Sequence, residues 1–212
     1  MDTTATTEAT LGIATARPRR QRVAQLITDV LSPAVLVAGL LLVVAWHSAT
    51  SAAQALLLGL VAAAAGSFVP ITYILRGVRR GRWTDRHVKV REQRKLPILV
   101  CLISTLVGTV LLYAVGAPRE LVALIASMVA SLVLTWPVTV MLRWKVSVHA
   151  LVAAGAAGAL GVVFGPVAWL AWPIAAVVCW SRVVLRDHTV RQVIVGSIIG
   201  AVATCALFPA LY

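Results

Sequence analysis

Residues 167–211 read VAWLAWPIAAVVCW, then SRVVLRDHTVRQ, then VIVGSIIGAVATCALFPAL, so a polar segment separates two apolar runs. A span needs about 20 predominantly apolar residues. A charged side chain costs roughly 2.5 to 3.5 kcal/mol at a bilayer centre, and much less at the membrane face. The pattern therefore predicts two membrane spans, Val167–Trp180 and Val193–Leu211, joined by a polar loop at the membrane surface.

The whole chain has the composition of a membrane protein. Apolar residues make up 60% of its 212 residues, whereas soluble domains use about 45 to 50%, and the mean hydropathy is +0.94. We therefore predict an all-α, polytopic transmembrane helix bundle of about six or seven spans, with little chain left for a soluble domain. An interfacial helix at Val23–Leu31 precedes the earlier spans, which we expect at Ser32–Trp46, Ala52–Leu75, Leu96–Val115, Glu120–Leu142 and 149–165.

The charged residues predict the domain limits and the orientation. Residues 1–22 are rich in Thr and Ala, end in a group of arginines and contain no apolar run, which is typical of a disordered basic tail. Residues 23–212 form the transmembrane domain. The loop Arg76–Lys95 holds nine Lys and Arg, and the other face holds only Arg119. The positive-inside rule then places the N-terminus and the basic loops of this multi-pass cell-membrane protein in the cytoplasm.

Composition also argues against several classes of function. The net charge of +12 suits anionic headgroups or a phosphorylated substrate. Nucleic acid is not an expected partner, because the basic residues adjoin spans and no soluble module carries them. Cys101, Cys179 and Cys205 each lie within an apolar run, without the paired spacing of a metal site. We predict neither a metal nor a cofactor.

Small residues gather in the fifth and seventh spans. They include the run from Ala153 to Gly161 and the pair Gly196 and Gly200. Small side chains at four-residue spacing let helix backbones approach closely in lipid. We expect these two helices at the centre of the bundle; that the glycines serve a homo-oligomer instead is the alternative.

Three loops on the same face offer groups that could bind and attack a phosphate. Arginine forks bind phosphate oxygens in pairs, hydroxyls and helix N-termini add donors, and two histidines can act as nucleophile and proton donor. For the loop Arg76–Lys95, anchoring to anionic lipid explains the charges equally well. The candidate groups are His87, Lys89, Arg91, Arg94 and Lys95, then Lys145, Ser147 and His149, then Ser181, Arg182, Asp187 and His188.

The last two loops resemble the signatures of the type 2 phosphatidic acid phosphatase superfamily. Ser181-Arg182, five residues and then His188 is similar to its third signature, S-R-x5-H-x3-D. Ser147-Val148-His149 is similar to the second, P-S-G-H. His87, six residues and then Arg94-Lys95 resembles the first, K-x6-R-P, more loosely. The resemblance extends from Trp144 to the C-terminus.

This resemblance implies a function and a set of roles. The protein would be an integral membrane phosphatase of a lipid or polyprenyl phosphate, working without metal at the cytoplasmic face. His188 would attack phosphorus to form a phosphohistidine, and His149 would protonate the leaving alcohol and later activate water. Arg182, Ser147 and Arg94 would bind phosphate, with Arg91 and Lys95 as further ligands on charge alone. Gln192 stands at the orienting position, where the family has Asp; the side chain of Asp187 is expected to point elsewhere.

Three other functions remain open at this point. Gln192 and the replacement of the signature glycine by Val148 favour a noncatalytic membrane protein of the same fold that binds anionic lipid or a partner. A prenyltransferase would need paired carboxylates for Mg²⁺, but Asp85 and Asp187 each stand alone. A transporter would more naturally carry charged or interrupted spans near the midplane, whereas here the polar groups gather at one edge.

Overall fold

The computed structural model describes residues 18–211, and every regular element among them is helical. Two π-helical segments, η1 (Ala64–Phe68) and η4 (Ala203–Leu207), continue α3 into α4 and α9 into α10, and 3-10 turns η2 (Arg91–Arg94) and η3 (Pro166–Leu170) precede α5 and α8. The α-helices are α1 (Arg19–Val30), α2 (Pro33–Ser48), α3 (Ala52–Ala63), α4 (Val69–Arg79), α5 (Lys95–Ala114), α6 (Arg119–Val140), α7 (Val148–Phe164), α8 (Ala171–Val184), α9 (Val190–Val202) and α10 (Phe208–Leu211).

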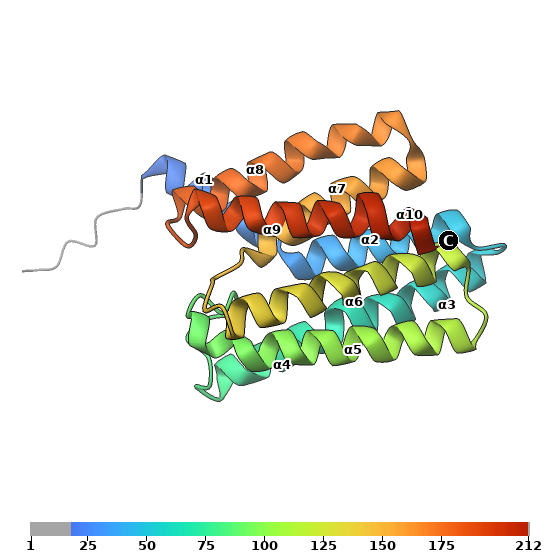
Figure 1. The fold of residues 1–212 in the computed structure, drawn as a ribbon, viewed down its shortest axis with the longest axis horizontal. Coiled ribbons are helices and arrows are strands. Elements are labelled where there is room, and N and C mark those ends of the chain that lie inside the picture. Colours follow the sequence, from blue (N-terminus) through green and yellow to red (C-terminus); the bar gives the residue numbers. More distant parts are fainter. Residues whose placement is uncertain (1–17, 212) are drawn as a thin grey trace, which may run out of the picture.

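The helices lie side by side along the long axis of the molecule, with their loops at its two ends (Figure 1). Five helical stretches are long and apolar enough to cross a membrane: Ala52–Arg79, Arg91–Ala114, Arg119–Val140, Pro166–Val184 and Val190–Leu211. The pair α1 and α2, bent by 43°, would make a sixth, and α7 is a shorter apolar helix of 17 residues. The predicted all-α membrane bundle is confirmed.

Helix α7 packs against α2, α8 and α9, and its contact with α9 is the most extensive between two helices of the bundle. A Cβ atom on Gly200 would overlap the carbonyl oxygen of Leu151, and one on Gly196 would lie 2.5 Å from the carbonyl oxygen of Ser147. Only glycine lets the two backbones meet at these points. The predicted close packing of the two small-residue helices is confirmed. Helix α7 lies inside the bundle, whereas α9 keeps an exposed outer face at Ile194 and Ile198.

Several element boundaries differ from those predicted, and two of the differences concern the polar end of the bundle. Helix α1 begins at Arg19, so the last residues of the predicted tail form its first turn, while residues 1–17 lie outside the described part of the chain. Helix α8 continues to Val184, past the predicted span end at Trp180. Ser181 and Arg182 can remain helical because their polar groups are bonded within the protein and need no exposure at a loop.

The α7–α9 crossing gives a test of the fold. Gly200→Ala forces the two backbones apart, and overpacking of this kind costs about 1–3 kcal/mol. We expect a lower thermal unfolding temperature in detergent, measured by circular dichroism. Gly39→Ala is the matched control, since a Cβ at this exposed helical position meets nothing within 4 Å. An equal effect of both substitutions would contradict the close crossing.

Candidate active site

The three polar loops meet at one end of the bundle (Figure 1, left). The Nη1 atom of Arg94 donates to the carbonyl oxygen of Val146 at 2.7 Å. Lys145 Nζ donates to the carbonyl oxygen of Asp187 at 2.7 Å, and Lys89 Nζ lies 3.0 Å from the Asp187 carboxylate. Each loop is therefore bonded to the other two, which confirms the predicted convergence.

His188 precedes α9 and is held by the first turn of that helix. The Oε1 atom of Gln192 accepts the backbone N–H of Thr189 at 3.3 Å as part of a capping box. The same oxygen lies 3.1 Å from His188 Nδ1, so Nδ1–H is the donor. The Nε2 atom then carries the lone pair, and it lies 3.5 Å from Nη2 of Arg94. Gln192 thus fixes the tautomer that a nucleophilic Nε2 requires.

The surroundings of His188 keep its ring neutral. Its side chain is buried, and burial disfavours the charged form. The cationic groups of Arg94, Lys145 and Arg182 add to this effect, and together these causes lower the His188 pKa to about 3, against the opposing hydrogen bond to Gln192. At neutral pH the lone pair on Nε2 is therefore free of a proton.

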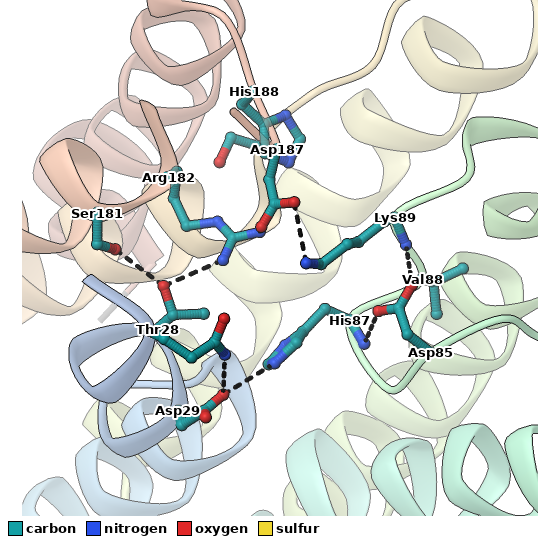
Figure 2. A network of polar contacts seen from close by, with 12 residues as sticks. Thr28, Asp29, Asp85, His87, Val88, Lys89, Ser181, Arg182, Asp187 and His188 are labelled. Carbon is teal, nitrogen blue, oxygen red and sulfur yellow. Dashed lines mark hydrogen bonds and ion pairs between the residues drawn. The ribbon is translucent and has the colours of Figure 1, made fainter. Parts of the chain in front are cut away.

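Arg182, only 1% exposed, lies at the centre of a polar network between α1 and α8 (Figure 2). Its Nη1 donates to Thr28 Oγ1 at 3.1 Å, and its Nη2 lies 2.8 Å from Asp187 Oδ2. Thr28 Oγ1 also lies 3.0 Å from Ser181 Oγ. The Nε atom has no hydrogen-bond partner among residues 18–211. Asp187, as expected, is directed away from His188, and it forms ion pairs with Arg182 and Lys89.

Ser147 and His149 occupy the N-terminal end of α7. Ser147 is the N-cap, with its Oγ accepting the N–H of Ala150 at 3.5 Å, and its own N–H donates to the carbonyl oxygen of Gln192 at 3.3 Å. The buried ring of His149 lies 5.1 Å, centroid to centroid, from the ring of His87. Within the described residues, His149 Nε2 has no hydrogen-bond partner. Both histidines named by the two signatures therefore sit at helix N-termini that touch.

The three candidates from the first loop lie in different environments. Arg94 is buried beside His188, and its Nε donates to the carbonyl oxygen of Val88 at 2.8 Å. Arg91 is half-buried and forms an ion pair with the neighbouring Glu92. Lys95 is exposed at the first residue of α5. The structure brings Arg94 to the histidines, and in the described part of the chain it gives Arg91 and Lys95 no contact with them.

A cavity of about 450 Å³ opens beside this cluster. Arg86, His87, Arg94 and His149 line its polar end. His188 and Arg182 are not among the lining residues, and Arg94 links His188 to the cavity wall. The volume is within the roughly 300 to 1,000 Å³ of small-molecule sites. Helices α2, α4, α5, α6 and α7 form its apolar body with Leu40, Ile71, Ile74, Ile98, Leu124, Met128, Leu132 and Val152.

Sequence reasoning missed the contribution of α1. Thr28 contacts Arg182, and Asp29 forms an ion pair with Arg86 and a hydrogen bond with the ring of His87. The one available signal was Asp29 itself, an acidic residue in a chain with only 7 Asp and Glu, placed within the predicted interfacial helix.

Fold and site together define the class: an α-helical membrane protein in which buried arginines and histidines meet at one end of an apolar cavity. Residues 143–212 match the model of the PAP2 superfamily, the phosphatidic acid phosphatase superfamily whose signatures the sequence resembles. The match covers the C-terminal third of the chain and agrees with the predicted resemblance to this superfamily. Comparison with curated proteins and with solved structures gives no match.

The neutral state of His188 makes stability depend on pH. Because its pKa is about 3 in the folded protein and near 6.5 when unfolded, the unfolded chain binds more protons between these values. The neutral His188 therefore does not lower the free energy of unfolding above pH 6.5. On acidification this free energy falls, by on the order of 2 kcal/mol between pH 7 and pH 5. Burial also lowers the pKa of His87, which acts in the same direction.

Thermal unfolding across pH 4.5–7.5 checks this dependence. His188→Asn should give a shallower fall in unfolding temperature on acidification than the wild type. The control His47→Asn, at the opposite end of the bundle, should leave the slope as it is. A wild-type slope in His188→Asn would contradict the burial of a neutral ring.

Proposed function

We propose that the protein is a membrane phosphatase that hydrolyses a lipid or polyprenyl phosphate through a phosphohistidine at His188. The observation that carries the proposal is the cavity, which joins a cluster of arginines and histidines to an apolar body between five helices. Such a shape suits a ligand with an anionic head and a long apolar tail. The match to the PAP2 superfamily supports the same reaction class.

The first half of the reaction uses both signature histidines. The neutral Nε2 of His188 attacks phosphorus, a P–N bond forms, and the bond from phosphorus to the ester oxygen breaks. His149 gives its proton to that oxygen, so the lipid leaves as an alcohol. The hydrogen bond from His188 Nδ1 to Gln192 stabilises the tautomer that attacks. In the second half water attacks phosphorus, a base takes the water proton, and the P–N bond breaks to release phosphate.

The arginines stabilise the charge that develops on the phosphoryl oxygens. The position of Arg94 supports this role, because its Nη2 lies 3.5 Å from Nε2 of His188. Arg182 adds a second guanidinium, and the Ser147 hydroxyl lies at the N-terminus of α7, where backbone N–H groups favour an anion. Arg91 and Lys95 add positive charge to the loop that carries Arg94. The excess of basic loops at this end supports a cytoplasmic site.

A noncatalytic lipid-binding role is the second candidate, and one observation favours it. Arg94 and Arg182 already donate to backbone carbonyls, to Thr28 and to Asp187. Arginines engaged in this way hold the loops together whether or not a phosphate is processed. This role predicts saturable binding of a lipid phosphate without turnover.

Phosphate release by the purified protein in detergent separates the two candidates. With phosphatidic acid, lysophosphatidic acid, polyprenyl phosphate and polyprenyl diphosphate as substrates, and EDTA in excess, we expect release from at least one. His188→Ala should abolish it because the nucleophile is gone, and His149→Ala should reduce it about 10²- to 10⁴-fold. His47→Ala is the control histidine. Turnover retained by His188→Ala would exclude the phosphohistidine.

The cavity can be tested separately from the chemistry. Met128→Trp fills the apolar body of the cavity from α6, so it should raise KM at least tenfold for long-chain substrates and much less for a short-chain one. Leu134→Trp is the matched control, since Leu134 lies on the same helix but is half exposed and does not line the cavity. An equal effect on both chain lengths would place the tail elsewhere.

A further inference from the structure

A carboxylate–histidine pair lies at the polar end of the cavity, outside the segment that matches the PAP2 superfamily. Asp29 Oδ1 is 3.1 Å from Nε2 of His87 (Figure 2). The backbone N–H of His87 donates to Asp85 at 2.7 Å, which fixes the loop that carries the ring. The His87 side chain is only 10% exposed. The pair is thus built from α1 and the first polar loop, and both of its members line the cavity.

In the Asp29–His87 pair a carboxylate is bonded to the histidine ring, and neither of the two signature histidines, His188 and His149, has such a partner. His188 is held by the neutral amide of Gln192, and His149 Nε2 has no polar partner among the described residues. A carboxylate bonded to one ring nitrogen stabilises the imidazolium that forms when the other nitrogen takes a proton. Nε2 of His87 lies 3.1 Å from Asp29 Oδ1 and 3.3 Å from Nε of the exposed Arg86, which can only donate. The contact with the carboxylate is the shorter one, so we assign Nε2–H as the donor to Asp29, and Nδ1 is then the nitrogen that accepts.

The position of His87 brings it to the reacting groups. Its ring faces that of His149 at 5.1 Å, and both rings line the end of the cavity that Arg94 connects to His188. The charged groups around it are Asp29 from α1, Asp85 and Arg86 from its own loop and Arg182 from α8. Both carboxylates favour a proton on His87, and Asp29 is the one that lies against its ring.

We propose that His87 is the general base of the second half-reaction, with Asp29 as its positioning residue; this rests on the proposed phosphatase function. His87 Nδ1 takes a proton from the water that attacks phosphorus, and the new P–O bond forms as the P–N bond to His188 breaks. The electron pair of that bond returns to Nε2 of His188. The proton on His87 passes to solvent, and His149, which gave its own proton to the alcohol, is reprotonated from solvent. All atoms and charges are then restored.

Replacing His87 tests its role as general base, because only the hydrolysis of the phosphohistidine should be lost. His87→Gln should turn over about 10²-fold more slowly, yet release about one equivalent of alcohol per protein in a burst. Phosphohistidine should accumulate, detected as acid-labile, base-stable label from a ³²P-labelled lipid phosphate. Wild-type turnover, or slow turnover without accumulated phosphoenzyme, would overturn the role of His87. Failure of the wild type to form any phosphohistidine would instead refute the proposed function.

Substitutions at Asp29 test its positioning role through the pH dependence of kcat, which would not change if Asp29 only stabilised the fold. Asp29→Asn should lower kcat about tenfold with little change in KM, and should move the acid limb of the kcat profile to lower pH because His87 loses the charge that favours its proton. Asp29→Glu should restore part of kcat and the position of that limb. Gln25→Ala, which removes a 2.9 Å hydrogen bond to Asp29 but leaves the carboxylate, is the control. An unmoved acid limb in Asp29→Asn would overturn the pairing.

Discussion

The contact between α7 and α9 is the constraint on which the site depends. Gly196 and Gly200 let the α9 backbone lie against that of α7, and the N–H of Ser147 bonds to the carbonyl oxygen of Gln192 across the contact. His149 is the second residue of α7, and His188 lies just before the N-cap of α9. A larger residue at either glycine would separate the two helix N-termini, and the histidines would separate with them.

Arg94 and Arg182 are buried at the polar end of the bundle, so their charges need partners within the protein. Removing one partner of a buried ion pair is strongly destabilising, while the intact pair contributes little net stability. Arg182 is balanced by Asp187 and Thr28, and Arg94 by two backbone carbonyls. These bonds position the loops, and the same cations keep His188 unprotonated. Structural bonding and the electrostatics of the site thus depend on the same few side chains.

Much of this could be predicted from the sequence, because the signals were local. Runs of apolar residues predicted the spans, and the spacing from Ser181 to His188 predicted a loop that meets the one at Ser147. The end of α8 was placed too early, since Arg182 was assumed to need water, whereas Thr28 and Asp187 bond to it. A partner 153 residues away in the chain, such as Thr28 for Ser181, leaves no periodic pattern. The cavity was also beyond prediction, because it depends on how five helices leave space between them.

The charge distribution of the site explains how a neutral residue, Gln192, can stand where the family has Asp. A carboxylate there would raise the basicity of His188 but would add negative charge at Nδ1, on the same ring as the Nε2 that an anionic phosphate approaches in the proposed reaction. With Gln192, the tautomer of His188 is fixed by an uncharged oxygen, and Arg94 remains available to the phosphate. The negative charges of the site lie instead on Asp187, paired with Arg182 and Lys89, and on Asp29, paired with Arg86 and His87. In the proposed mechanism, the nucleophile His188 and the proton acceptor His87 then have different neighbours, so the basicity of each ring can suit its own step.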